Sequence, residues 1–417
     1  MFPRIAFLLI FLAVLLFFEF YAFQAIKTLF KSKIIVYSYK IFSFIWILVV
    51  LYGLNQFDRS KGQTIGNMYT VGILLVFLIP KIVLSLTLFG EDIFRVFAGI
   101  VYKFYPKKED EAFFTSRRKF VSQIGLGIAA VPFIGMLYGI FIGRYNYKVI
   151  YQTLFFDDLP DAFDGFKLTQ ISDVHSGSFD NPSKIEYAID LINEQESDLI
   201  LFTGDIVNNV AKEMHPWIET FKNIKNYEFG KYSILGNHDY GEYLDWDSFP
   251  KGAKDKNFQE IKDLYGAIDF KLLLNENVKI KKGNDEIALV GVENWGKGFK
   301  QAGDLNKASE NLKKEDFKIL MSHDPSHWEM EVKEHPKHFH LTLSGHTHGM
   351  QFGIEIPGWI KWNLAQIVYK QSAGLYEHAK KYIYVNRGFG YHAFPGRVGI
   401  MPEITVIELR KGKNLTA

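Results

Sequence analysis

Side chains able to bind metal ions follow five short apolar runs in the C-terminal two thirds of the chain. The runs are FKLTQIS, DLILFT, KYSIL, FKILMS and FHLTLS, and the segments after them are DVH, GD, GNHDY, HDP and GHTHG. Their candidate ligands are Asp173, His175, Asp205, Asn237, His323, His346 and His348. A buried carboxylate such as that of Asp205 is costly to desolvate unless a cation lies beside it. The pattern therefore predicts one metal site shared by the five strand ends.

The ligand types narrow the choice of metal. Carboxylate, imidazole and amide groups without sulfur suit Mn²⁺, Fe²⁺ or Zn²⁺, and we favour Mn²⁺. The candidates are too many for one tetrahedral ion and about enough for two, with Asp205 as the natural bridging carboxylate. Two divalent ions, two aspartates and a bridging hydroxide leave the site positive, and the neutral side chain of Asn237 preserves that charge. A pair of ions about 3.5–4 Å apart would clamp the attacking and leaving oxygens of a phosphoryl displacement.

The spacing within each motif is consistent with this interpretation. In extended backbone, residues i and i+2 point the same way, so Asp173 with His175, and His346 with His348, would each meet one centre. The glycines that precede three of the motifs let the backbone turn sharply. They are Gly204, Gly236 and Gly345.

The elements that position these residues alternate between strands and helices, which predicts an α/β domain with a largely buried sheet. Strands are expected at 166–172, 198–203, 231–235, 286–292, 317–322, 339–344, 381–385 and 403–409. A helix is expected in PSKIEYAIDLINEQ, where Pro182 stands at the first helical position. Ligands in such sheets gather outside the carboxyl ends of the strands.

The ordered set DVH…GD…GNHD…H…GHTH resembles the calcineurin-like metallophosphoesterase superfamily over about residues 165–410. The resemblance implies an α/β/β/α sandwich. It implies a first metal held by Asp173, His175, Asp205 and His348. It implies a second metal held by Asp205, Asn237, His323 and His346.

The resemblance also implies catalytic residues. His238 would contact the phosphate as a general acid, oriented by Asp239. Asn208 and Tyr240 follow ligand motifs closely enough to touch substrate. Arg397 is either a phosphate contact or part of a structural ion pair. Within the superfamily the chain is similar to membrane-anchored bacterial phosphodiesterases that have a twin-arginine-like leader and an NRG-x-G…R…PEIT pattern.

The first ~145 residues differ from the rest, because they are dominated by Phe, Leu, Ile, Val and Tyr. Four apolar runs, near 5–23, 34–54, 68–89 and 120–143, are long enough to cross a bilayer, which takes about 20 residues. We therefore expect a transmembrane region at 1–145 and a catalytic domain at 146–417. Glu19, Lys40 and Lys81 lie inside the spans and indicate either helix pairing with snorkelling or an intramembrane relay.

Lys and Arg residues predict the orientation, because they are enriched in cytoplasmic loops. The loops after the first and third spans are the more basic ones, with Lys107 and Lys108 in the latter. This places the N-terminus and the catalytic domain outside the cytoplasm. The segment SRRKF, with Arg117 and Arg118, is either a twin-arginine-like export signal or an ordinary basic flank.

Three functions are compatible with these features. The first is a membrane-anchored phosphoesterase of the inner or cytoplasmic membrane, acting on a lipid-linked or cell-envelope substrate. The alternative is a hydrolase of UDP-2,3-diacylglucosamine, which is a cytoplasmic substrate and conflicts with an outward domain. The third is a non-catalytic receptor or scaffold, but no candidate ligand is missing. The net charge of +2 gives no indication of nucleic-acid binding, and the absence of cysteine excludes thiolate ligands.

Overall fold

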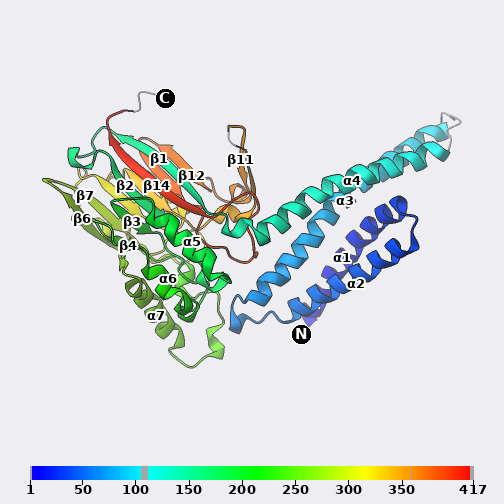
Figure 1. Cartoon of the computed structure of the whole chain (residues 1–417), viewed down its shortest axis with the longest axis horizontal. Coiled ribbons are helices and arrows are strands. Elements are labelled where there is room, and N and C mark those ends of the chain that lie inside the picture. The colour runs from blue at the N-terminus through cyan, green and yellow to red at the C-terminus, as the bar shows by residue number, and fades with distance from the viewer. Residues whose placement is uncertain (1, 105–110, 357, 414–417) are drawn as a thin grey trace. The chain divides into compact units, whose positions relative to one another are not determined.

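Four long apolar helices form the first unit of the computed structural model, which describes residues 2–104, 111–356 and 358–413 (Figure 1). They are α1 (Phe2–Leu29), α2 (Lys33–Asn55), α3 (Ile65–Phe104) and α4 (Glu111–Phe141). Each contains an apolar segment of at least 23 residues, which is enough to cross the hydrocarbon core of a bilayer. The four predicted spans are confirmed, and the chain is a multi-pass membrane protein.

A buried polar cluster joins three of these helices. Glu19 of α1 accepts hydrogen bonds from Tyr39 (2.9 Å), Ser43 (2.8 Å) and the indole of Trp46 (2.8 Å), all on α2. The Lys81 ammonium of α3 also pairs with the Glu19 carboxylate. A charge inside a membrane region needs such partners, because lipid provides none. The contacts therefore favour helix pairing as the role of Glu19 and Lys81.

The helices α3 and α4 continue beyond the predicted spans into charged sequence. Arg118 of α4 lies 2.6 Å from a Glu91 carboxylate oxygen and 2.7 Å from one of Asp92, both on α3. The Arg117 guanidinium lies 3.4 Å from the centre of the Phe94 ring. Both arginines of the SRRKF segment thus hold α4 against α3. Lys107 and Lys108 lie outside the described residues.

Two six-stranded mixed sheets form the second unit, which contains residues 58–65 and 139–417. The first sheet has the order β1 (Lys148–Phe156), β14 (Glu403–Lys411), β2 (Phe166–Ile171), β3 (Leu199–Phe202), β4 (Lys231–Ser233) and β5 (Lys271–Leu272). The second has the order β12 (Gly374–His378), β13 (Lys381–Val385), β9 (Leu341–Ser344), β8 (Lys318–Met321), β7 (Asp285–Gly291) and β6 (Glu276–Lys282). A separate antiparallel hairpin consists of β10 (Gly353–Ile356) and β11 (Ile360–Asn363).

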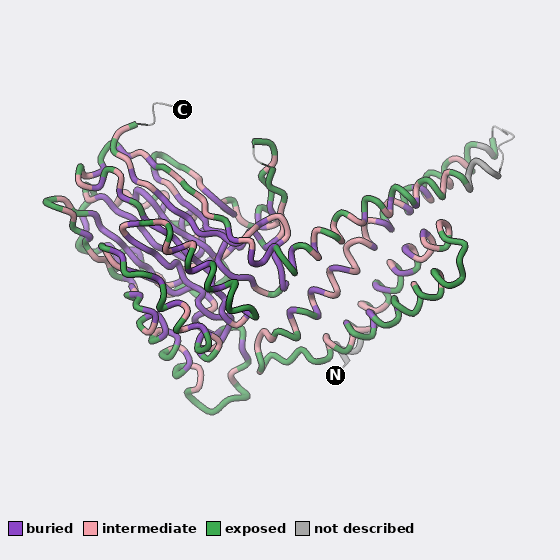
Figure 2. Tube along the Cα trace, in the orientation of Figure 1, coloured by how far each residue is buried: buried purple, intermediate pink, exposed green. Residues whose placement is uncertain are grey.

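The two sheets pack face to face. One buried apolar cluster contains Leu168 and Leu201 of the first sheet together with Leu289, Ile319 and Leu343 of the second. Figure 2 shows that buried residues are concentrated in these sheets, whereas the residues of α1–α4 are mostly exposed or intermediate. Apolar residues facing both ways explain the uninterrupted hydrophobic runs of the inner strands.

Helices cover the outer faces of both sheets. The first sheet carries α5 (Pro182–Asn193), α6 (Ile218–Lys222) and α7 (Ala253–Ala267), as the ring contact between Phe202 and Tyr265 of α7 illustrates. The second carries α8 (Leu305–Ala308) and α9 (Pro325–Met330), whose Leu305 and Trp328 join a cluster with Val290 and Leu320. The predicted α/β/β/α arrangement is confirmed.

Two short segments from the span-rich part of the sequence belong to this second unit. Gln63, in the loop between α2 and α3, accepts a hydrogen bond through its side-chain oxygen from the Ala393 backbone (3.0 Å). Near the end of α4, the Gly139 carbonyl accepts one from the Arg397 backbone (3.1 Å). Both contacts fall on the 392–401 loop of the phosphoesterase domain. The 392–401 loop therefore contacts both of these segments.

Candidate metal centre

The seven predicted ligands all lie at one edge of the sandwich. The strands β2, β3 and β4 run parallel, as do β7, β8 and β9, so each set delivers its following loop to one edge. Potential ligand atoms converge there in three groups, each within 4.8 Å. The groups are Asp173 with His175 and His348; His175 with Asp205 and His238; and Asp205 with His323 and His346.

The first group is built around Asp173. Its carboxylate accepts hydrogen bonds from the His346 backbone N–H (3.0 Å), and one oxygen lies 3.3 Å from Nε2 of His348. The rings of His175 and His348 lie 4.9 Å apart between their centres. All three side chains of the group are buried. The loops after β2 and β9 therefore meet at this carboxylate.

Two histidines of the third group, His323 and His346, lie around the side-chain oxygen of Asn237. That oxygen lies 2.7 Å from Nδ1 of His346 and 3.1 Å from Nε2 of His323. Nδ1 of His323 lies 2.7 Å from the Thr203 carbonyl, which can only accept a hydrogen bond. The contact fixes the ring so that Nε2 faces the cluster.

Asp205 belongs to both the second and the third group, and His175 links the second group to the first. One of its carboxylate oxygens lies 3.1 Å from Nε2 of His323 and 3.7 Å from Nε2 of His175. The other accepts a hydrogen bond from the His238 backbone (2.8 Å). The side chain thus occupies the place expected of a carboxylate between two ions. A cation at this position would account for a buried carboxylate directly after strand β3.

The donor set fits divalent cations. Nδ1 of His175 is buried and meets no hydrogen-bond partner among the described residues. Nε2 of His348 is buried 3.3 Å from an Asp173 oxygen but is not aligned for a hydrogen bond with it. Burial also lowers the pKa of both imidazoles, well below 6.5 for His175, which favours the neutral rings that bind metal ions. For His323, burial lowers the pKa, but the carboxylates of Asp205 and Asp173 and the hydrogen bond to Thr203 together outweigh it and raise the pKa to about 10. A cation at this position would take the place of that proton. The clusters are consistent with a dinuclear metal site.

The backbone differs from the extended form that the i, i+2 spacing suggested. Asp173 (φ 53°), His175 (φ 47°), His346 (φ 70°) and His348 (φ 49°) all adopt left-handed conformations. Such strain in non-glycine residues persists only where the surroundings impose it, and it is common at functional sites. The tight turn also sends His346 and His348 to different groups, so the expectation that they meet one centre is wrong.

His238 stands beside the ligands but is oriented differently from the expectation. Its Nδ1 lies 2.7 Å from the Asn208 carbonyl, and its backbone bonds to Asp205. The Asp239 carboxylate instead accepts bonds from the Asp205 and Gly236 amides (3.0 and 2.9 Å). Burial raises the pKa of Asp239 to about 7, with the Asp205 charge adding to the effect. Asp239 therefore holds the two ligand loops together, and the Asn208 carbonyl orients His238.

The three residues expected to touch substrate are buried and held by internal hydrogen bonds. The Arg397 guanidinium donates to Nδ1 of His348 (2.9 Å) and to the Arg387 carbonyl (2.6 Å). The Tyr240 hydroxyl donates to Glu293 (3.0 Å), and the Asn208 side chain bonds to Ser178. These contacts indicate positioning roles, and contact of these residues with substrate stays a prediction. Arg397 orients the His348 ring by donating to its Nδ1, because a guanidinium has no acceptor atom.

Three further residues, Tyr369, Asp324 and His392, lie beside the candidate ligands or His238. The Tyr369 hydroxyl lies 2.8 Å from Nε2 of His346, and an Asp324 oxygen lies 3.3 Å from the same atom. The His392 ring lies 4.5 Å from His238 and 5.0 Å from His175, measured between ring centres. The sequence signal for His392 is its place in the Gly/Pro-rich segment GFGYHAFPGRVG. Tyr369 has no motif of its own.

Gly345 is expected to be indispensable for the first group. A Cβ at this position would lie 1.9 Å from the Ser172 hydroxyl and 2.2 Å from an Asp173 carboxylate oxygen. We expect Gly345→Ala to weaken metal binding by about 10–100-fold and to lower the free energy of unfolding by about 1–3 kcal/mol. Isothermal titration with Mn²⁺ and thermal unfolding would measure both effects.

The matched control is Gly266→Ala in α7, where a Cβ would meet nothing within 4 Å. Alanine is the better helix former, so this variant should unfold at the same temperature or slightly higher. If Gly345→Ala bound metal as tightly as Gly266→Ala, the close approach seen at Gly345 would not matter for the site.

The fold and the site together define a metal-dependent phosphoester hydrolase. Residues 166–350 match the family model for calcineurin-like phosphoesterases, and the chain belongs to that family. Residues 4–144 match the model described as the probable transmembrane domain of calcineurin-like phosphoesterases. The N-terminal spans are thus part of a recurring architecture.

Two relatives and one solved structure are similar to this chain. Metallophosphoesterase YkuE of Bacillus subtilis is 30% identical over 301 residues, covering 71% of this chain and 98% of that protein. A transmembrane protein with metallophosphoesterase domain from Danio rerio is 26% identical, covering 66% of this chain and 60% of that protein. The solved NAD nucleotidase of Haemophilus influenzae superimposes with a TM-score of 0.36 and 13% identity, over 54% of this chain and 45% of that one.

Proposed function

We propose that the protein hydrolyses phosphate esters at a pair of divalent cations, with Mn²⁺ favoured over Fe²⁺ and Zn²⁺. The first cation would be held by Asp173, His175, Asp205 and His348. The second would be held by Asp205, Asn237, His323 and His346. The observation that carries this proposal is the position of Asp205, whose carboxylate lies within 3.7 Å of histidines from both groups. Histidine and carboxylate ligands without sulfur suit these metals.

A bound pair of ions would supply Lewis acidity and a water molecule of lowered pKa. The protein's own contribution begins with His238. Because the Asn208 carbonyl can only accept, Nδ1 of His238 carries the hydrogen in that 2.7 Å contact, which leaves Nε2 for the substrate. When that ring is protonated, Nε2–H can give its proton to the departing oxygen. With two divalent ions bound, the net charge of the centre would be positive, so it would attract an anionic phosphoryl group.

The membrane region supports a substrate that resides at a membrane or in the cell envelope. Four spans tether the catalytic domain to the bilayer, so its working concentration at that surface is high. The basic loops after the first and third spans favour an extracytoplasmic domain. We do not propose that the SRRKF segment is an export leader, because ion pairing with Glu91 and Asp92 accounts for Arg118.

An activity panel tests the proposed function. The purified full-length protein would be assayed in detergent with p-nitrophenyl phosphate, its bis ester, a phospholipid, a nucleotide sugar and a teichoic-acid-type polymer. We expect Mn²⁺-dependent release from at least one phosphoester and none after chelation. Hydrolysis that proceeds equally in excess chelator would contradict the proposal.

The orientation is tested separately. Alkaline phosphatase, which is active only outside the cytoplasm, and β-galactosidase, active only inside, would each be fused after Ala417. We expect the phosphatase fusion to be active. An active β-galactosidase fusion would instead place the domain in the cytoplasm and would favour a substrate such as UDP-2,3-diacylglucosamine.

A further inference from the structure

An exposed apolar surface covers the β10–β11 hairpin and the short helix η11 (Leu364–Ile367). The apolar hairpin surface consists of Ile354, Ile356, Trp359, Trp362, Ile367 and Val368. Trp359 is 78% exposed, Ile367 74% and Val368 66%. Single exposed hydrophobic residues are ordinary in proteins, but several gathered on one small element mark a contact surface.

The hairpin is connected to the place where the chain leaves its last span. The Gly353 N–H at the start of β10 donates to the Val398 carbonyl (2.9 Å). The neighbouring Arg397 N–H donates to the carbonyl of Gly139, which lies two residues before the end of α4 at Phe141. Two hydrogen bonds therefore lead from the spanning helix to the hairpin. This continuity points to the bilayer, rather than another protein, as the occupant of the surface.

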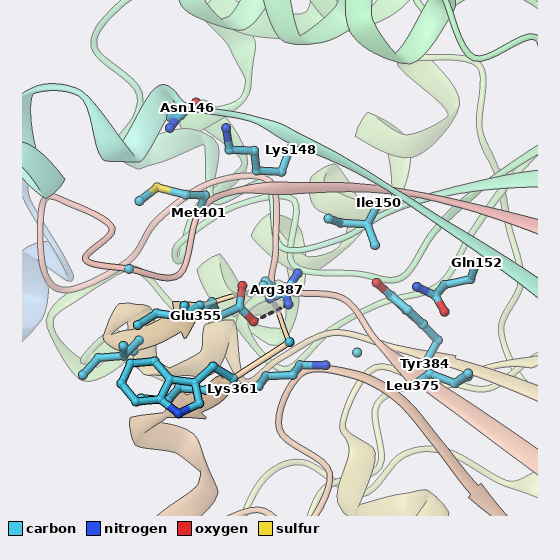
Figure 3. Close-up of a pocket in the computed structure, with 18 residues that line it drawn as sticks. Asn146, Lys148, Ile150, Gln152, Glu355, Lys361, Leu375, Tyr384, Arg387 and Met401 are labelled. Carbon is cyan, nitrogen blue, oxygen red and sulfur yellow. Dashed lines mark hydrogen bonds and ion pairs between the residues drawn. The ribbon is translucent and has the colours of Figure 1, made fainter.

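A cavity of about 930 Å³ lies behind the hairpin (Figure 3). The side chains of Lys148 and Lys361 lie on opposite sides of it, and apolar residues of the hairpin form one wall. Arg387 pairs with Glu355 (2.5 Å), which also lines the cavity, and with the buried Glu403 (2.6 Å). Lys148 and Lys361 are the two further cations of the lining. Lysines beside an apolar surface suit the anionic headgroups of a membrane.

The same surface leads to the metal centre. Val368 is followed by Tyr369, whose backbone N–H donates to the Ala365 carbonyl (2.8 Å) and so belongs to the η11 turn. The Tyr369 hydroxyl lies 2.8 Å from Nε2 of His346. The exposed Val368 is thus directly followed in sequence by a residue whose side chain contacts a candidate ligand.

We propose that the apolar hairpin surface lies in the headgroup layer of the membrane that the four spans cross. From there the metal centre acts on an amphiphilic phosphoester drawn from that layer. Tryptophan side chains favour this interfacial region, aliphatic side chains such as isoleucine enter its boundary with the acyl chains, and nearby lysines add attraction to anionic lipids. The membrane contact stands on the structure alone, whereas the choice of substrate rests on the proposed phosphoesterase function.

The depth of the hairpin can be measured directly, because the chain contains no cysteine. Trp359→Cys would be labelled with nitrobenzoxadiazole in full-length protein reconstituted in equal parts of phosphatidylcholine and phosphatidylglycerol. Tyr187→Cys on α5, where the native side chain is 52% exposed, is the matched control. We expect nitroxide-labelled lipids to quench the probe at position 359 and aqueous dithionite to reduce it slowly, with the reverse at 187.

Two results would overturn the membrane contact. One is a probe at position 359 that dithionite reduces as fast as the probe at 187. The other is a probe at 359 that is shielded only by a second copy of the chain, detected as protection that disappears on dilution into empty vesicles.

The second part of the proposal, delivery of a membrane substrate to the metal centre, is tested with the double variant Trp359→Ser and Ile367→Ser. The matched control is Tyr187→Ser. Hydrolysis of a phosphodiester lipid embedded in the vesicles should fall about tenfold, while hydrolysis of soluble bis-p-nitrophenyl phosphate stays within about twofold. An equal loss on both substrates, or none on either, would contradict delivery along the hairpin. Absence of any phosphoesterase activity in the unsubstituted protein would overturn the proposed function instead, and the probe depths would still decide the membrane contact.

Discussion

Replacing His238 by alanine is expected to lower kcat by about 10²–10⁴-fold while both metal ions stay bound. The reason is geometric: the ring is fixed by the Asn208 carbonyl (2.7 Å) beside Asp205 and His175, where it can reach a leaving oxygen. The measurement is steady-state hydrolysis of bis-p-nitrophenyl phosphate, together with the metal content of the same preparation. A substrate with a better leaving group should lose less, because it needs less help from an acid.

The metal content separates two roles that His238 could have. His238 shares a group with His175 and Asp205, so a ligand role would lower the metal content of the variant along with its activity. The matched control is His378→Ala, a half-exposed histidine that pairs with Glu334 away from the centre. Activity of His238→Ala equal to that of the control would remove His238 from the mechanism.

Asp205→Asn should be the most damaging single change to metal binding. The substitution keeps the size of the side chain and its hydrogen bond from the His238 backbone, but it removes the charge between the two groups. We expect the content to fall from about two ions per chain to one or fewer and activity to fall more than about 10³-fold. Elemental analysis after gel filtration would measure the loss.

The control for this change is Asp157→Asn, an exposed aspartate paired with Lys380. It should keep full metal content and full activity, since surface ion pairs contribute little. An Asp205→Asn protein that retained two ions would show that another side chain bridges them. That result would remove the observation on which the proposed function depends.

The location of the centre could be predicted because it follows from strand order. Each ligand motif directly follows a buried strand, and parallel strands bring their carboxyl ends to one edge. Asp173, Asp205 and His323 were therefore expected to meet, although 150 residues separate the first from the last. The residue types then limited the chemistry to divalent metals.

The contacts around the ligands could not be predicted, because many involve the backbone or distant loops. His238 is held by the carbonyl of Asn208, and any residue at that position would offer the same atom. Arg397 reaches Nδ1 of His348 across 49 residues of sequence. The neighbouring Asp239 was the obvious partner of His238 by sequence, but it accepts hydrogen bonds from backbone amides in two loops.

The elements of the fold also differ in how well the sequence predicts them. The inner strands, such as β3 and β8, are largely apolar runs that can be recognised as strands from the sequence. The strands β1, β6 and β12 lie at sheet edges, and the β10–β11 hairpin is largely exposed; their mixed sequences give weaker signals. In the membrane region, length and hydropathy predicted all four spans, but the pairing of Glu19 with Lys81 depends on how three helices pack.

The dependence of activity on two bound metal ions is tested most directly by the metal content of active, full-length protein. Inductively coupled plasma mass spectrometry would measure this content alongside turnover. We predict about two transition-metal ions per chain, parallel loss of ions and activity during chelation, and recovery of both with Mn²⁺. Full turnover in protein that contains no bound metal would contradict it.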